Sequence, residues 1–439
     1  MKVIADLEVH SKYARAVSSS MTPPIIAEWA DKKGIDLVGT GDFTHPMWFR
    51  ELEANLEEGG EGVYKLKSQI PNLKSKSGAK FLLTSEVSCM YKHLGRGRRV
   101  HLLVYLPSFD AVRKFNTELS GRGANLFSDG RPIIGLTLAQ VAEIALSVNR
   151  RALLIPAHVW TPWFGFYGQM SGYDSLGEAF GDLAKYIPAV ETGLSSDPAM
   201  NWRIEELTGR RIVSFGDAHS PPKLGREATV FEMPEISFEN ARKAIWGEGD
   251  SHIAYTIEFY PEEGKYHYTG HRNCKVVYSP NETRKMGTVC PVCGKSLTVG
   301  VMNRVEHLGK IDIETKAKVD EFGVRWIYDV QEKRPQYVML VPLLEIIAEA
   351  LSSGVSSQKV MIIYEELIAT FGSEFKVLLE TSVIDIEKKF GPRVAEGVKK
   401  VRSGDIVIEP GYDGIFGKVK IWKEHEVKTK RAISQASFF

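Results

Sequence analysis

The sequence predicts an α/β barrel, then a small metal-stapled module, then a mostly helical region. Three observations support this order. Short apolar strand patterns alternate with helical patterns over residues 1–260, histidine and cysteine residues cluster over 261–310, and helical patterns prevail over 311–430. Residues 431–439 are predicted to form a flexible tail. With 439 residues and 43% hydrophobic content, each part can have a core of its own.

The barrel prediction depends on seven apolar runs that read as strands with crossover helices between them. The predicted strands span 3–9, 36–40, 81–84, 101–106, 152–155, 189–190 and 211–215, and the clearest helices span 23–33, 138–146 and 238–245. In the C-terminal part, helices are predicted over 340–351, 359–371 and 374–379. The Gly-rich stretch 404–421 is predicted to form a hairpin.

Composition excludes some classes of protein. The net charge of +1 does not mark the whole chain as a polyanion binder, so a nucleic-acid surface would have to come from local clusters. No run reaches the about 18 apolar residues of a membrane helix, and the N-terminus lacks a signal-peptide pattern. A soluble, cytoplasmic protein without a membrane partner is expected. Four cysteines are too few for a disulfide framework, and Cys89 is predicted to be a buried small hydrophobe.

Side chains able to bind metal recur at or near the predicted strands. A lone histidine or aspartate after a strand is more often a cap or a core group, so the argument depends on the repetition. The C-terminal ends of the strands in a parallel barrel open on one face, where these side chains would converge. The predicted ligands are Glu8, His10, Asp42, His45, Glu86, His101, His158, Asp217 and His219. Glu191 is left outside this set as a residue that orients ligands.

Carboxylates gathered at this density raise one another's pKa unless cations are bound. The mixture of imidazole and carboxylate suits zinc, manganese or iron better than calcium or magnesium alone. We therefore expect two or three divalent cations in the barrel (Zn²⁺, Mn²⁺ or Mg²⁺) and hydrolysis of a phosphoester. Glu86 is predicted to bridge the metals, and Glu86, Asp217 and His219 are predicted to be catalytic.

The motifs ADLEVHS, GTGDFTH, TSEVS, HLLVY, PAH and GDAHS, in this order, resemble those of the PHP (polymerase and histidinol phosphatase) superfamily over residues 1–235. The resemblance implies a distorted seven-stranded β/α barrel that holds up to three metals. The first motif of that superfamily usually reads His-x-His, and here Glu8 takes the first position. A carboxylate at this position adds negative charge, which is expected to shift the metal preference.

A second metal site is predicted beyond the barrel. His271, Cys274, Cys290 and Cys293 form the pattern H-x2-C-x15-C-x2-C, a spacing that closes a tetrahedral zinc site. Because protein would fill all four positions, one structural Zn²⁺ is expected there. His267 is the competing candidate for the histidine ligand.

A PHP-type barrel followed by this ribbon and by CPVCGKSLTVGVMNRVEHL, RPQYVMLVPLLEIIAEAL and EPGYDGIFGKVKIW resembles the endonuclease Q family across essentially the whole chain. The resemblance implies a metal-dependent DNA endonuclease. Such an enzyme nicks on the 5′ side of deaminated bases (uracil, hypoxanthine and xanthine) and of abasic sites, and so initiates repair. Two alternatives remain: a PHP phosphatase on a small phosphoester, and a clamp-tethered DNA-binding module with an inactive barrel. A phosphatase with a small substrate would need neither the ribbon nor the basic residues near the C-terminus. An inactive barrel is disfavoured because the other predicted metal ligands, Glu86, His101, His158, Asp217 and His219, are present.

An enzyme that tests a damaged base extrudes the base from the stack, so aromatic and polar groups near the metals are candidates for holding DNA. The competing interpretation is that the aromatic side chains pack a loop and that the cations are only solvated. The predicted DNA contacts are Arg15, Lys92, Arg96, Arg98, Arg99, Trp160, Trp163, Ser195 and Ser196. A second basic stretch comprises Lys418, Lys420, Lys423, Lys428, Lys430 and Arg431. The mostly helical part, residues 311–430, is predicted to be a DNA-binding domain.

The last five residues have the form Q-x-[SD]-x-F, which is similar to peptides that bind the bacterial β sliding clamp. Gln435, Phe438 and Phe439 are the predicted contacts. The archaeal clamp peptide fits less well, because its aromatic pair needs longer spacing. Clamp binding would therefore indicate a bacterial source.

Overall fold

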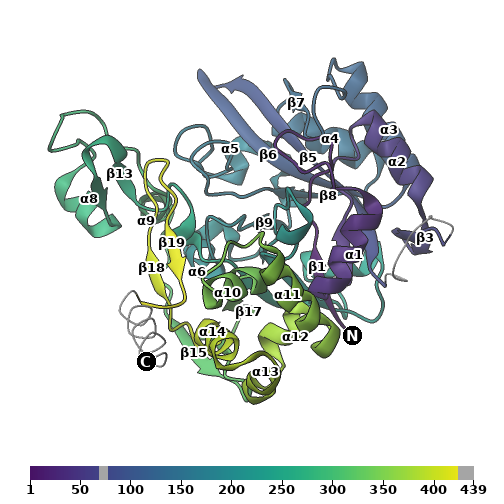
Figure 1. Cartoon of the computed structure of the whole chain (residues 1–439). Helices are drawn as coiled ribbons and strands as arrows, with labels where there is room; N and C mark the ends of the chain where they lie inside the picture. Colours follow the sequence, from purple (N-terminus) through teal and green to yellow (C-terminus); the bar gives the residue numbers. More distant parts are fainter. Residues whose placement is uncertain (69–77, 424–439) are drawn as a thin grey trace, which may run out of the picture.

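The computed structural model of the chain describes residues 1–68 and 78–423. The fold is mixed α/β, with one large mixed sheet and a helical C-terminal region (Figure 1). The main path through the sheet runs β15 (Thr315–Val319), β16 (Arg325–Asp329), β17 (Gln336–Met339), β12 (His252–Glu258), β11 (Ala228–Glu232), β1 (Lys2–Asp6), β2 (Leu37–Gly39), β5 (Lys80–His93), β4 (Val63–Leu66) and β3 (Leu56–Gly60). Off this path, β6 (Arg96–Leu106) pairs with β5 and with β8 (Leu153–Pro156), and β7 (Ile133–Ile134) pairs with β5.

Each of the seven predicted strands has a counterpart: β1, β2, β5, β6, β8, and the parallel pair β9 (Ala189–Glu191) and β10 (Arg211–Val213). The expectation of an all-parallel arrangement is wrong, because β6 runs antiparallel to both β5 and β8. Only Leu94 and Gly95 separate β5 from β6, and both have positive φ, 49° and 77°. Such a two-residue turn joins antiparallel strands only. The closed barrel implied by the family resemblance stays a prediction.

The loops that follow β1 and β10 lie side by side. Val9 and Ala218 form an isolated parallel bridge, in which the His10 amide donates to Ala218 and the Ala218 amide donates to Glu8. Beneath these loops, alternate residues of β1 enter a buried apolar cluster with side chains of β6 and β8; Val3, Ala5, Leu103 and Ile155 belong to it. The loops thus rest on a rigid base.

The helices predicted in the first part are all present. Helix α1 (Pro23–Lys33) has the predicted bounds, with Pro at its start and Gly34 in the left-handed conformation at its end. Helices α4 (Leu138–Val148) and α7 (Phe238–Trp246) cover the other two predictions. The remaining helices of this part, which the sequence analysis did not assign, are α2 (Pro46–Asn55), α3 (Phe109–Gly121), α5 (Leu176–Phe180) and α6 (Pro198–Trp202).

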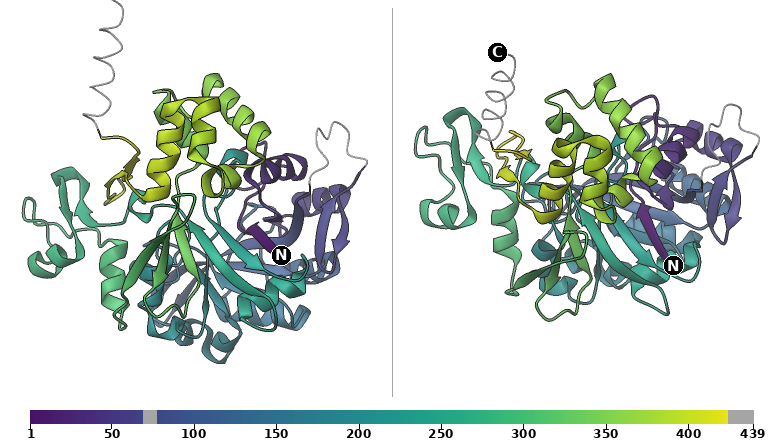
Figure 2. Two further views of the ribbon diagram at one scale, coloured as in Figure 1. Left: turned by 90° about the horizontal axis from the view of Figure 1, so that it is seen from below. Right: turned by 60° about the horizontal axis from the view of Figure 1, so that its bottom comes forward.

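The charged segment before the C-terminal helices differs from the expectation of a helical region. It forms β15, β16 and β17, and β17 pairs in parallel with β12, so residues 315–339 extend the large sheet. The helices that follow are α10 (Leu343–Ala350), α11 (Gln358–Phe371), α12 (Glu374–Leu379), α13 (Val383–Phe390) and α14 (Pro392–Ser403). Figure 2 shows these yellow-green helices gathered on one side of the molecule. The buried Lys33 of α1 pairs with Glu374 of α12 at 2.7 Å and ties the two parts together.

A small module extends from one side of the molecule in all views (Figures 1 and 2). It comprises β13 (Thr269–His271), β14 (Val276–Tyr278), α8 (Pro280–Met286) and α9 (Val301–Leu308). The predicted hairpin is present as β18 (Val407–Glu409) and β19 (Lys418–Lys420). Among the described residues, no helix combines the length and apolarity needed to cross a membrane. The predicted domain boundaries stay predictions.

Candidate metal centre and adjoining pocket

The first group of candidate ligands comes from the two loops bridged by Val9 and Ala218. The ligand atoms of His10, Asp217 and His219 all lie within 4.8 Å of one another. His10 Nε2 is 3.2 Å from an Asp217 oxygen, and the His219 ring meets the His10 ring edge-on with centroids 4.7 Å apart. The backbone bridge between the loops therefore also sets the distance between these side chains.

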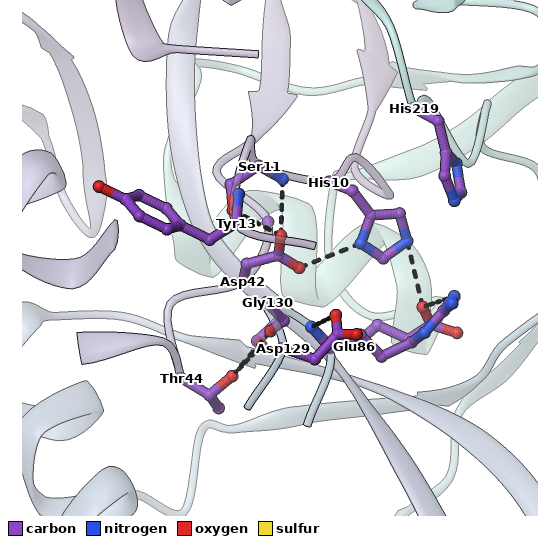
Figure 3. A network of polar contacts seen from close by, with 12 residues as sticks. His10, Ser11, Tyr13, Asp42, Thr44, Glu86, Asp129, Gly130 and His219 are labelled. Atoms are coloured by element: carbon purple, nitrogen blue, oxygen red, sulfur yellow. Dashed lines mark hydrogen bonds and ion pairs between the residues drawn. The ribbon is translucent and has the colours of Figure 1, made fainter. Parts of the chain in front are cut away.

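The second group lies on the antiparallel strands. Glu86 is in the middle of β5, His101 is in the middle of β6 and His158 follows β8, and their ligand atoms again lie within 4.8 Å of one another. Glu86 Oε1 is 2.5 Å from His101 Nδ1 and 3.1 Å from His158 Nε2. Its other oxygen is 3.2 Å from His10 Nε2 (Figure 3). Glu86 therefore joins the two groups, the central position that a bridging carboxylate requires.

Asp42 holds His10 in place from the other side. Asp42 Oδ1 is 3.0 Å from His10 Nδ1, and Asp42 Oδ2 accepts hydrogen bonds from the amide and the hydroxyl of Ser11 (Figure 3). An imidazole whose Nδ1 is engaged in this way presents Nε2 to the cluster. The contacts of Asp42 are those of a group that orients a ligand.

Glu8 and Glu191 lie together at the buried end of the cluster. Burial, followed by the charges of Glu191 and Asp217, raises the pKa of Glu8 well above its ordinary value, and burial raises the pKa of Glu191 to about 7. In the part of the chain that the structure describes, neither Glu8 oxygen has a hydrogen-bond partner, although both are fully buried. Two buried carboxyls in contact resist ionisation, and a bound cation is the usual compensation.

Arg131 is a site residue that the sequence analysis missed. Its guanidinium lies 2.9 Å from Glu86 Oε2, and its backbone amide donates to Asp129. A Cβ on Gly130 would come within 2.4 Å of an Asp42 oxygen, so only glycine allows this loop to approach the cluster. The sequence signal is weak, since Arg131 is a single cation in a loop and no local pattern marks it.

Arg131 and the histidines set the charge at the centre. Burial acts to raise the pKa of Glu86, but the positive charge of Arg131 holds that pKa well below its ordinary value. Asp217 is likewise held ionised, against its burial, by the His10 imidazole, whose Nε2 lies 3.2 Å from an Asp217 oxygen. Burial lowers the pKa of His101 to about 4, so this imidazole is neutral at pH 7 and can donate a lone pair to a metal.

His45 is not brought into either group. Its Nδ1 accepts a hydrogen bond from the Trp48 amide at the start of α2, and its ring stacks on Tyr13 with centroids 4.6 Å apart. Capping a helix and packing on Tyr13 account for this side chain. Its predicted role as a metal ligand stays a prediction that these contacts do not favour.

Three residues of the centre have left-handed backbone conformations. The φ angles of Asp42, His158 and Asp217 are 47°, 29° and 43°. Non-glycine residues avoid this region, and such strain gathers at functional sites, where the surrounding structure holds it. His158 is held by Glu191, whose carboxylate accepts the His158 amide. These strained backbone conformations cost free energy, and they orient the three side chains toward the centre.

A pocket of about 560 Å³ opens directly beside the centre. His101, His158 and Asp217 form one wall. The rest is lined by residues of the loops after β8 and β9, by residues within 261–267, and by Val301 and Phe416. His267 is part of this lining. His267 therefore belongs to the pocket and not to the group formed by the three cysteines.

The histidine and three cysteines of the small module converge as their spacing predicts. The ligand atoms of His271, Cys274, Cys290 and Cys293 lie within 4.8 Å of one another. Cys290 and Cys293 share a tight turn in which the Gly294 amide donates to the Cys290 carbonyl. Of the two candidate histidines, the structure places His271 with the cysteines.

Comparison with known proteins identifies the family. The lesion-specific endonuclease PfuEndoQ from Pyrococcus furiosus is 34% identical, with 98% of this chain and 99% of that chain covered and a TM-score of 0.80. Endonuclease Q in complex with a 27-mer duplex that has an abasic lesion at the active site is 35% identical over 97% of this chain and 98% of that chain, with a TM-score of 0.81. The chain belongs to the endonuclease Q family.

Two further similarities extend beyond the solved members of the endonuclease Q family. The uncharacterised protein YqxK of Bacillus subtilis is 29% identical, covering 95% of this chain and 99% of its own length. MJ0043 of Methanocaldococcus jannaschii is 32% identical over 63% of this chain, which spans only 34% of MJ0043. The family described as the MJ0043 C-terminal domain matches residues 342–405, which include α10 to α14.

The predicted DNA contacts of this endonuclease Q family member fall into two sets. Lys92, Arg96 and Arg99 are exposed at the tip of the β5–β6 hairpin, and Arg15 is exposed beside Asp129. Trp163 and Ser195 line the pocket. Of these residues Ser195 is buried, and its hydroxyl donates to the Thr192 carbonyl. The role of all six in DNA binding stays a prediction.

The other set is buried. Arg98 is buried, stacks on Tyr173 and pairs with Glu178 at 2.6 Å. Trp160 donates its indole N–H to Asn201, and the hydroxyl of Ser196 donates to the Thr192 carbonyl. For Arg98, Trp160 and Ser196 the packing interpretation accounts for the side chain. The predicted clamp contacts Gln435, Phe438 and Phe439, and the tail cations Lys428, Lys430 and Arg431, lie outside the described residues.

Proposed function

We propose that this chain is a metal-dependent DNA repair endonuclease that nicks the phosphodiester 5′ of deaminated bases and abasic sites. The observation that supports it most is the position of Glu86, which joins two candidate metal groups beside a pocket of about 560 Å³. A hydrolytic centre next to a cavity large enough for a base is what an enzyme needs to cut next to an extruded nucleotide.

The residues of the centre fit divalent cations. The unpartnered buried oxygens of Glu8 and Glu191, both groups of imidazole and carboxylate donors, and the low pKa of Glu86 and Asp217 all favour bound positive charge. Glu86, His101 and His158 would hold one ion, and His10, Asp217 and His219 a second. Glu8 and Glu191 are candidates for completing this shell. Divalent ions bound there would supply Lewis-acid activation of water and neutralise the phosphodiester.

The side chains around the centre would position the reacting groups. Asp42 fixes the ring of His10, and Glu191 fixes the backbone of His158. Arg131 has part of its side chain exposed, so its guanidinium can contact a phosphate oxygen when Glu86 turns to a metal. The pocket would receive the base, with Ser195 and backbone groups of the 193–195 loop at its edge.

The small module is proposed to bind one structural Zn²⁺ through His271 and the three cysteines. Four protein donors leave no position for substrate, so hydrolysis is assigned to the other centre. Metal analysis of purified protein should find one zinc per chain that Cys293→Ser removes and Asp217→Asn does not.

The function is tested with end-labelled duplexes that carry one uracil, hypoxanthine or abasic site, each with Mg²⁺, Mn²⁺ or Zn²⁺ and with undamaged DNA for comparison. The expected product is a single nick 5′ of the lesion with a 3′-hydroxyl, lost by at least about 1000-fold in Asp217→Asn, which removes a ligand charge from the centre. Asp110→Asn, a change at an exposed helix position, is the matched control.

Two results would refute the proposal. Hydrolysis of small phosphomonoesters without lesion-dependent nicking would indicate a phosphatase. Tight binding to DNA without cleavage in any metal would indicate a binding module. The proposed contact with a bacterial β clamp is tested separately by removing residues 435–439, which should abolish clamp binding and leave nicking of short duplexes unchanged.

A further inference from the structure

Phe416 is a large apolar side chain exposed beside the pocket. It lies in the turn between β18 and β19, its exposure is 62%, and its neighbour Ile415 is also exposed. Phe416 lines the pocket that borders His101, His158 and Asp217. Isolated exposed apolar residues are common on proteins, but an aromatic ring at the rim of a polar active site is a candidate for contact with a ligand.

The turn that presents Phe416 is held rigidly by the chain beneath it. Gly411, Gly414 and Gly417 donate their amides to carbonyls of residues 262–265, and Asp413 accepts from Thr298 and from the Arg272 amide. A Cβ on Gly411 or Gly417 would come within 2.4 Å or 2.1 Å of a backbone carbonyl oxygen. Both glycines are needed for this close packing, which holds the turn in one position against residues 262–265.

The positive charge of Lys265 beside the Phe416 ring indicates which kind of ligand this surface would bind. The ammonium of Lys265 lies 5.0 Å from the centre of the Phe416 ring, and Lys265 also lines the pocket. An aromatic face next to a cation suits a nucleic acid, whose bases stack and whose phosphates attract the lysine. Trp163 and Tyr266, which pack together with centroids 5.2 Å apart, line the same pocket.

Extrusion of a base leaves a gap in the duplex, which must be filled or collapse. Proteins that unstack DNA commonly insert an apolar side chain into the gap, and base–aromatic stacking then offsets the lost base stacking. An exposed aromatic ring, held by a rigid turn beside a pocket large enough for a base, could insert into such a gap. Phe416 is placed at the rim, where it can reach the stack that the base has left.

We propose that Phe416 is a wedge that enters the base stack of duplex DNA while the lesion occupies the pocket. The inference rests on the proposed function and adds a step to it, because a wedge is needed only when a base must be withdrawn from a paired stack. A lesion in single-stranded DNA has no opposing strand and does not need it.

The experiment compares Phe416→Ala with wild-type protein on uracil in a duplex and on the same uracil in single-stranded DNA. Duplex cleavage should fall by about 10-fold or more, the scale of one lost base–aromatic stack, with a change of less than about 2-fold on the single strand. Phe416→Trp should restore duplex cleavage. Ile408→Ala, on the same hairpin but outside the pocket lining, is the control and should leave both rates unchanged.

Equal losses on both substrates would overturn the wedge and place the ring against the extruded base. Unchanged duplex cleavage would overturn any role in opening the stack. A second measurement uses 2-aminopurine next to the uracil in a metal-free binding assay. Wild-type protein should raise its fluorescence and Phe416→Ala should raise it less, whereas an equal rise would contradict the proposal. Absence of cleavage by wild-type protein on every lesion refutes the proposed function itself, so the two failures are distinguishable.

Discussion

At the scale of single residues, Glu8 is a buried carboxyl whose ionised form is unfavourable unless a cation lies nearby. Its carboxyl is fully buried against Glu191, and both oxygens lack hydrogen-bond partners among the described residues. Burial and the neighbouring carboxylates raise its pKa, so the charged form destabilises the fold when no cation is bound. A histidine at this position would not add that negative charge. We therefore predict that a cation bound beside Glu8 would stabilise the fold.

Replacing Glu8 by glutamine should separate these effects. In EDTA at pH 8, Glu8→Gln should melt at a higher temperature than wild-type protein, because the amide cannot ionise beside Glu191. Addition of Mn²⁺ should raise the melting temperature of wild-type protein more than that of the variant. Thermal melts with and without Mn²⁺ measure both differences.

Glu118→Gln, at an exposed position of α3, controls for the loss of one charge. An equal gain from Mn²⁺ in Glu8→Gln and wild-type protein would show that Glu8 does not respond to the bound ion.

At the scale of elements, the β5–β6 hairpin serves two purposes along its length. Its central residues Glu86 and His101 belong to the metal centre, and its tip exposes Lys92, Arg96 and Arg99. Figure 1 shows β5 and β6 as long neighbouring strands that extend beyond the rest of the sheet. A rigid hairpin of this kind can fix the distance between a phosphate contact and the reacting phosphodiester.

If the tip contacts phosphates, its charge governs the salt dependence of DNA binding. Changing Lys92, Arg96 and Arg99 together to glutamine should lower the slope of log affinity against log salt by about 2 to 3, since each contact on duplex DNA contributes about 0.9. Fluorescence anisotropy at several salt concentrations gives the slope.

The matched comparison changes Lys388, Lys389 and Lys399, cations of α13 and α14 that lie outside the hairpin, to glutamine. A slope that falls equally in both variants would mean that only net charge matters and that the tip makes no specific contact.

At the scale of the whole molecule, β12 joins the first part of the sheet to β17 of the C-terminal part. Its last residue, Glu258, is buried and accepts hydrogen bonds from Ser214 and Thr256. Burial raises its pKa from 4.5 to about 8, despite these hydrogen bonds. Between these two pH values the unfolded chain has lost the proton that the folded chain keeps. Stability therefore falls as pH rises through this range, by at most about 1.4 kcal/mol per pH unit.

Glu258→Gln should remove this pH dependence, because glutamine stays neutral and its carbonyl can accept the same hydroxyl hydrogen bonds. The melting temperature of the variant, relative to wild-type protein, should be higher at pH 8 than at pH 5. Differential scanning calorimetry at both pH values checks the sign, with Glu118→Gln for comparison. A difference that grows toward low pH would contradict a raised pKa.

Much of the fold and of the candidate centre could be predicted from the sequence. Strand patterns predicted β1, β2, β5, β6, β8, β9 and β10, and proline and glycine punctuation predicted the bounds of α1. The strands β15 and β16 were missed because their charged, partly exposed residues lack a clear apolar alternation. The strand β17 has only four residues, too few to show a period. Arg131 was missed because a single arginine in a loop has no local pattern.

The sequence by itself determined the chemistry available: imidazoles, carboxylates and thiolates at fixed spacings along strands and turns. The spacing of His271 and the three cysteines made this site predictable, since only two residues separate the ligands within each pair. Only the tertiary structure decided that β6 runs antiparallel, that His45 stacks on Tyr13, and that Arg131 contacts Glu86. These outcomes depend on pairing between segments far apart in the chain, where packing and hydrogen bonding across the fold, and not local spacing, set the distances.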